Sequence, residues 1–210
     1  MMKKFKLIGL LLPALMLSSC LGYYSKVSHL SDEELEWVNC YNVGDTVLFE
    51  SDSGMVDTLV VDYKNIENSR WPFYIHFIDN MKGDYYNATA IYTFDIKGLQ
   101  TNIEGSFRVT KLSENDSIEW KSYLMRRFSN GWPYKLGRGA KSVYDKENPI
   151  KVTDYIYNGK KLSNCIVFDD DNSTTSKYND YPDSIESYVI SKEYGLLTYK
   201  FAGGDTYTRK

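Results

Sequence analysis

The chain has 210 residues, and 25 lysines and arginines against 28 aspartates and glutamates give a formal net charge of −3 at pH 7. Hydrophobic residues make up 42% and charged residues 25%, which is typical of a folded protein and excludes intrinsic disorder. The acidic balance argues against nucleic acid as a partner, and 2 histidines with 3 cysteines give no pattern for a zinc cluster. An aromatic content of 15% favours β-structure.

The first twenty residues are typical of a bacterial secretory signal. A basic segment with three lysines precedes an apolar run, residues 7–17, that is too short to span a bilayer stably. The run ends in Leu17-Ser18-Ser19-Cys20, which resembles the lipobox of bacterial lipoproteins. The resemblance implies cleavage of residues 1–19 as a signal peptide and acylation of Cys20, so that a lipid anchor holds the chain at a membrane.

The residues after Cys20 bear on the destination of the lipoprotein. Leu21 stands where lipoproteins retained in the inner membrane typically carry Asp, and the resemblance therefore implies the outer membrane. Surface-exported lipoproteins of the Bacteroidota type usually carry acidic residues directly after the cysteine, whereas the first acid here is Asp32. We therefore expect the periplasmic face rather than the cell surface, with residues 20–30 as a lipidated cysteine and tether.

A short helix is predicted next. Ser31 and Glu34 have the spacing of a capping box, and Leu30 and Leu35 occupy the positions of a hydrophobic staple. Acidic residues in the first turn suit the helix dipole, and we expect the helix to end near Asn39.

The rest of the chain is predicted as strands joined by tight turns. Alternating apolar residues and turn signals such as Asn158-Gly159 indicate antiparallel hairpins without the spacing of βαβ units. The sequence thus predicts an all-β fold, an antiparallel meander of about ten strands in one domain, residues 31–210, as a barrel, half-barrel or sandwich. The predicted strands are 46–51, 57–63, 73–78, 85–94, 103–109, 118–124, 151–157, 161–168, 185–191, 196–201 and 206–209.

One spaced pattern resembles the opening of small uncharacterised outer-membrane lipoproteins of the Bacteroidota type. It consists of Trp37, Tyr41, Gly44-Asp45-Thr46, Phe49 and Ser51. The closing residues 191–199 are similar to the ends of such proteins. This resemblance covers about a sixth of the chain and implies no activity. Physically, Gly44 punctuates a turn and Phe49 faces the core.

Cys40 and Cys165 remain after the lipobox cysteine. Outside the cytoplasm the two thiols can form a disulfide, which would stabilise the fold by about 3–5 kcal/mol if unstrained. Alternatively, each is a small buried hydrophobic residue, because both lie in apolar runs. Neither has a histidine or basic neighbour in sequence that would activate it as a nucleophile.

Other motifs indicate neither a metal nor a cofactor. Residues 169–180 resemble a calcium loop only faintly, since position 6 is Thr174 rather than Gly and no helices flank the loop, so a solvated acidic loop is the preferred interpretation. His76 alternates with apolar neighbours in a predicted strand and is interpreted as structural.

A basic and aromatic stretch, residues 120–141, stands out in the acidic chain. It contains six cations and no acid. Arginines bind phosphate or carboxylate through paired hydrogen bonds, and aromatic faces stack on sugars. One hypothesis is a glycan, lipid-headgroup or acidic-partner site; the alternative places the aromatic residues in the core and pairs the cations with acids of the same chain. The candidate ligand-binding residues are Arg126, Arg127, Trp132, Tyr134 and Arg138.

Together these features favour a non-catalytic, membrane-anchored lipoprotein that binds a ligand or partner protein in the cell envelope. Two alternatives stay open. One is a glycan- or anionic-ligand-binding module built on residues 120–141, and the other is a hydrolase whose carboxylates meet only in the fold.

Overall fold

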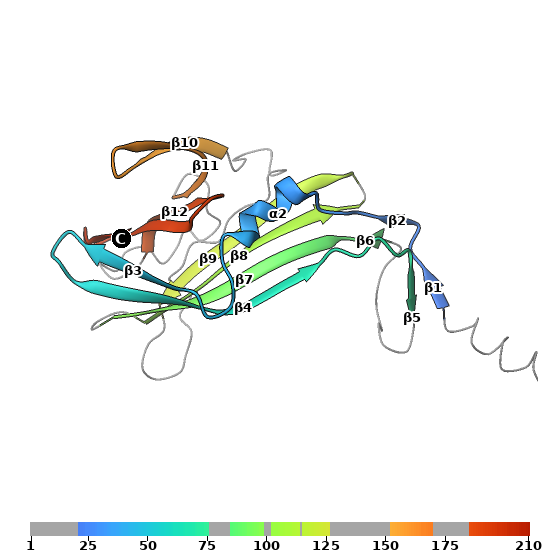
Figure 1. The fold of residues 1–210 in the computed structure, drawn as a ribbon, viewed down its shortest axis with the longest axis horizontal. Helices are drawn as coiled ribbons and strands as arrows, with labels where there is room; N and C mark the ends of the chain where they lie inside the picture. The colour runs from blue at the N-terminus through green and yellow to red at the C-terminus, as the bar shows by residue number, and fades with distance from the viewer. Residues whose placement is uncertain (1–20, 76–84, 99–101, 114, 127–151, 170–184) are drawn as a thin grey trace, which may run out of the picture.

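The computed structural model describes residues 21–75, 85–98, 102–113, 115–126, 152–169 and 185–210. Within them the protein is mostly β, with a ten-stranded antiparallel sheet that curls into a half-barrel (Figure 1). The elements are β1 (Leu21–Tyr23), β2 (Lys26–Val27), α2 (Asp32–Asn39), β3 (Thr46–Ser51), β4 (Val56–Glu67), β5 (Phe73–Ile75), β6 (Tyr85–Tyr86), β7 (Ala88–Lys97), β8 (Asn102–Leu112), β9 (Ser117–Arg126), β10 (Val152–Tyr157), β11 (Lys160–Phe168), β12 (Ile185–Ser191), β13 (Gly195–Phe201) and β14 (Thr206–Arg209).

The predicted all-β meander is confirmed, and of the three predicted architectures the structure is the half-barrel. The strand order is β10-β11-β12-β13-β14-β3-β4-β7-β8-β9. Sequential hairpins run from β10 to β14, and the last strand then pairs with β3, so that Arg209 lies opposite Phe49. The turn at Asn158-Gly159 joins β10 to β11 as predicted, with positive φ at both residues (47° and 74°), the geometry of a type I′ hairpin.

Helix α2 lies on the inner face of the half-barrel, against β7 and β8 (Figure 1). Its predicted capping box is present, because the Ser31 side chain accepts a hydrogen bond from the Glu34 amide and the Glu34 carboxylate accepts one from the Ser31 amide. Burial alone would raise the pKa of Glu34, but the Ser31 amide and the Lys111 ammonium, 3.0 Å away, outweigh it and lower that pKa. The helix is therefore tied at its first turn to β8.

Large aromatic side chains fill the space between the helix and the sheet. The Trp37 ring lies 6.0 Å from the Phe107 ring and 5.7 Å from the Trp120 ring, measured between centroids. Phe49 is fully buried, as predicted from its position after Gly44. Residues 103, 105, 107 and 109 face this core, which confirms the alternation predicted for residues 103–109.

Residues 21–30 differ from the predicted tether. They form β1 and β2, and Tyr24, Ser28 and Leu30 are buried. The Ser28 hydroxyl accepts a hydrogen bond from the Ala88 amide (2.7 Å) and donates to the Lys111 carbonyl (2.6 Å). These contacts hold the segment to the sheet, whereas local sequence alone, in strands of two or three residues, gives almost no periodic signal.

The predicted strand 73–78 also differs from expectation. Its described part, β5, does not join the ten-stranded sheet and pairs with β1 instead. The predicted strand 85–94 is divided into β6, which pairs in parallel with β2, and β7, which pairs with β4 along its whole length. In the ten-stranded sheet β4 pairs directly with β7, and the segment between them in sequence, which contains β5 and β6, is left out of that sheet. With β1 and β2, these two strands lie at one end of the molecule (Figure 1).

Candidate functional site

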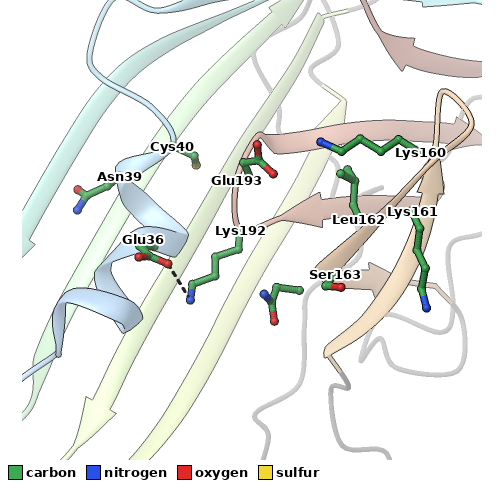
Figure 2. Close-up of a pocket in the computed structure, with 10 residues that line it drawn as sticks. Glu36, Asn39, Cys40, Lys160, Lys161, Leu162, Ser163, Lys192 and Glu193 are labelled. Atoms are coloured by element: carbon green, nitrogen blue, oxygen red, sulfur yellow. Dashed lines mark ion pairs between the residues drawn. The ribbon is translucent and has the colours of Figure 1, made fainter.

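A cleft of about 490 Å³ opens between α2 and the strands that face it across the half-barrel. Figure 2 shows the helix on one side and the β10–β11 hairpin with the β12–β13 turn on the other. Most of the lining residues are polar or charged, and they carry both signs of charge. The lining consists of Glu36, Asn39, Cys40, Lys160, Lys161, Leu162, Ser163, Asn164, Lys192 and Glu193.

A β-bulge in β11 shapes one wall of the cleft. Thr153 pairs with Cys165 and Tyr155 pairs with Leu162, so that Ser163 and Asn164 together oppose the single residue between Thr153 and Tyr155. Asn164 has a φ of 60°, a conformation that asparagine tolerates better than most residues. Such bulges re-aim side chains and are enriched beside functional sites. Here the bulge places a hydroxyl and an amide side by side on the cleft wall.

An ion-pair cluster joins the helix to the opposite wall. The Lys192 ammonium lies 2.9 Å from the Glu36 carboxylate and 3.5 Å from that of Glu33 (Figure 2). The Lys192 side chain is only 13% exposed, but those of Glu36 and Glu33 are 62% and 85% exposed, so water still screens both pairs. The Lys192 amide also donates to the Asn164 carbonyl (3.0 Å), which connects the cluster to the bulge. Lys192 therefore connects α2 with both the β12–β13 turn and the bulge.

The mouth of the cleft carries a second set of charges. Figure 2 shows Lys160 extending from the hairpin above the turn that bears Glu193. A hydrogen bond from the Tyr194 phenol to Glu193 raises the pKa of Tyr194, and the nearby Lys160 ammonium opposes that shift. Lys161 is directed elsewhere, to Asp154 at 2.6 Å, and together with the Ser163 hydroxyl it lowers the pKa of Asp154.

The two remaining cysteines carry free thiols. Cys40 lines the cleft, and burial raises its pKa to about 11; its thiol donates a weak hydrogen bond to the Trp37 carbonyl at 3.6 Å. Cys165 is fully buried with Leu162, Val189 and Leu197, and burial raises its pKa to about 11 as well. Both groups are protonated at neutral pH, which makes them poor nucleophiles.

Most residues of the predicted basic and aromatic site lie outside the described part of the chain, namely Arg127, Trp132, Tyr134 and Arg138. Arg126 is the last residue of β9. In the described start of the stretch, Trp120 packs against Trp37, Lys121 pairs with Glu119 at 2.6 Å, and Tyr123 donates to Glu104.

Cys20, His76 and residues 170–184 of the acidic loop also lie outside the described ranges. Among the residues that the structure does describe, no group of three or more His, Cys, Asp or Glu side chains is arranged to hold a metal ion. Over the same residues, no helix is long and apolar enough to cross a membrane.

The cleft itself was not predicted, although one signal for it exists in the sequence. The buried residues of β11 are Leu162 and then Cys165, an odd spacing that breaks the alternation of a regular strand and is typical of a bulge. The other lining residues come from α2 and from the β12–β13 turn, and only the fold brings them together.

Comparison of the chain with protein-family models, with curated proteins and with solved structures finds no match.

Proposed function

We propose that this chain is a non-catalytic lipoprotein, anchored through Cys20 in the outer membrane on its periplasmic face, that binds a ligand or partner protein in the cell envelope through the cleft beside α2. The observation that carries the binding role is the wall made by the bulge. Asn164 and Lys160 offer hydrogen-bond groups to an occupant that approaches from solvent, beside the Ser163 hydroxyl, which donates to Asp154. The lipobox residues 17–20 support the anchor.

The chemistry of the cleft supports binding rather than catalysis. Cys40 is the nucleophile candidate in its lining, and with a pKa of about 11 it stays a thiol at neutral pH. The Lys192 ammonium is engaged in ion pairs with Glu36 at 2.9 Å and Glu33 at 3.5 Å. Groups of both charges together with a hydroxyl and an amide suit a polar occupant that presents donors and acceptors, such as an extended segment of an envelope protein.

The anchor predicts a complete loss of acylation in Cys20→Ser, because only a cysteine thiol accepts the diacylglycerol. A palmitate analogue that is fed to cells should label the wild type and not the variant. Cys40→Ser is the matched control and should label like the wild type, since its thiol is protonated and partly buried. Labelling that persists in Cys20→Ser would refute the anchor.

The cleft predicts a photo-crosslink from its wall. A benzophenone amino acid in place of Ser163, in intact cells, should give a discrete adduct, whereas the same group in place of Ile156 should not. Ile156 is 65% exposed on the same hairpin but does not line the cleft. Lys160→Ala should weaken the adduct about 10- to 100-fold, the equivalent of one charge-assisted hydrogen bond of about 1.5–3 kcal/mol. Equal adducts at positions 163 and 156 would refute the site.

A further inference from the structure

Three large aromatic side chains are exposed at the end of the molecule where the described chain begins. Tyr23 is 62% exposed, Trp71 73% and Phe73 50%. Tyr23 and Phe73 are cross-strand partners in the β1–β5 pair, and their ring centroids lie 5.7 Å apart. Exposed apolar residues that occur singly need no explanation, whereas a cluster of this kind marks an interaction surface. We call Tyr23, Trp71 and Phe73 the aromatic platform.

The platform is held firmly to the half-barrel. The Tyr24 amide donates to the Pro72 carbonyl at 2.7 Å, which fixes the segment that carries Trp71 and Phe73 against the one that carries Tyr23. Tyr24 is 3% exposed and packs against Tyr86 at 5.5 Å between ring centroids. Because these residues connect to the buried Ser28 and to β7, the orientation of the platform is coupled to that of the whole sheet.

The platform is also next to the proposed lipid anchor. Leu21 is already in β1. Because an extended chain spans at most about 3.6 Å per residue, the three residues from Cys20 to Tyr23 span at most about 11 Å. With no tether between them, an acylated Cys20 holds this end of the molecule at the bilayer surface. Figure 1 shows β1 and β5 at one end of the fold and the β10–β11 hairpin towards the other.

The charges at this end favour the same occupant. Residues 21–30 and 70–75 carry Lys26 and Arg70 and no aspartate or glutamate, although the chain as a whole is acidic. The Arg70 guanidinium lies 3.1 Å from the His29 ring, through Nε to Nε2. Cations beside exposed Trp and Tyr rings are typical of protein surfaces that sit among lipid headgroups, where the rings lie at the interface and the cations meet phosphates.

We propose that the aromatic platform inserts into the headgroup region of the bilayer that carries the lipid anchor, and so orients the half-barrel with its β10–β11 hairpin pointing away from the membrane. This inference rests on the proposed anchor, and it goes beyond it, since a lipid chain alone fixes distance but not orientation. The occupant of the platform is a phospholipid surface.

Trp71 provides the measurement. The full-length protein, purified from cells and reconstituted into vesicles of phosphatidylethanolamine and phosphatidylglycerol, is compared with the same protein in vesicles with brominated acyl chains, which quench nearby tryptophans. The emission that is lost in Trp71→Phe defines the Trp71 signal, because the other three tryptophans, Trp37, Trp120 and Trp132, are the same in both proteins. We expect brominated lipid to remove most of that signal, and iodide in the water to remove little of it.

In the double variant Tyr23→Ser/Phe73→Ser, Trp71 should be exposed to water. Iodide should then quench its fluorescence, and brominated lipid should not. Ile156→Ser is the matched control, since it removes an equally exposed apolar side chain from the β10–β11 hairpin and should leave Trp71 quenched by lipid. Failure of brominated lipid to quench Trp71 in the wild type would overturn the proposal. A Trp71 emission that shifts with protein concentration instead would assign the platform to a second copy of the chain and overturn it equally.

The acyl label and the Trp71 signal are separate readouts on one sample. Absence of palmitate label refutes the anchor of the proposed function whatever Trp71 shows. Quenching of Trp71 by lipid supports the platform with or without the label, and its absence refutes the platform even where the label is present.

Discussion

Replacing Trp37 with alanine is expected to lower the free energy of unfolding by about 3–5 kcal/mol, the range for a large buried aromatic residue. Trp37 is 5% exposed and contacts Phe107 and Trp120 from the inner face of the half-barrel. Both partners belong to neighbouring strands, β8 and β9, which no other described helix covers. The loss of the indole leaves a cavity between helix and sheet that the curved strands cannot close.

Urea unfolding of Trp37→Ala and wild type measures this difference. Glu33→Gln on the same helix is the control; it is 85% exposed in its side chain and pairs with Lys192 at a loose 3.5 Å, so its effect should stay within about 0.5 kcal/mol. A loss below about 1 kcal/mol for Trp37→Ala would mean that the helix is not a packed part of the core.

Replacing Gly195 with alanine is expected to destabilise the fold by about 2–4 kcal/mol, from two causes. Gly195 has a φ of 71°, where an L side chain is strained, and an added Cβ would lie 2.2 Å from a carbon of the Tyr41 ring. Tyr41 is 1% exposed and has little room to move. The close approach joins the end of α2 to the β12–β13 turn, and the cleft lining should loosen with it.

Gly159→Ala separates the two causes. Gly159 has nearly the same φ, 74°, but a Cβ there would meet nothing within 4 Å. Gly159→Ala should therefore lower the free energy of unfolding by the backbone strain alone, about 1–2 kcal/mol. Thermal or urea unfolding of both variants gives the contribution of the Tyr41 contact as the difference between them. Equal losses of unfolding free energy in the two variants would show that the Tyr41 ring moves aside without an energetic penalty.

The sequence predicts the local elements of this fold well and the long-range ones poorly. The capping box at Ser31 and the hairpin at Asn158-Gly159 depend on a few adjacent residues, and both are confirmed. The pairing of β14 with β3 depends on contacts between residues about 160 positions apart, and alternation carries no information on which strands become neighbours.

The cleft beside α2 could not be predicted from the sequence for the same reason. Its lining comes from three separate parts of the chain, and no single segment resembles a motif. The predicted arginine site drew on a contiguous stretch instead, because contiguity is the only proximity that a sequence shows. In its described start, Lys121 and Tyr123 contact acids of the same sheet, and the site itself stays a prediction.

The position of β14 affects when the protein completes its fold. In the ten-stranded sheet, β14 is the strand that joins β10–β13 on one side to β3, β4, β7, β8 and β9 on the other. Because β3 precedes β14 by about 160 residues, this pairing is a contact of high sequence separation, and such contacts form late when a chain folds. Completion of the half-barrel therefore depends on a strand of only four residues, Thr206–Arg209.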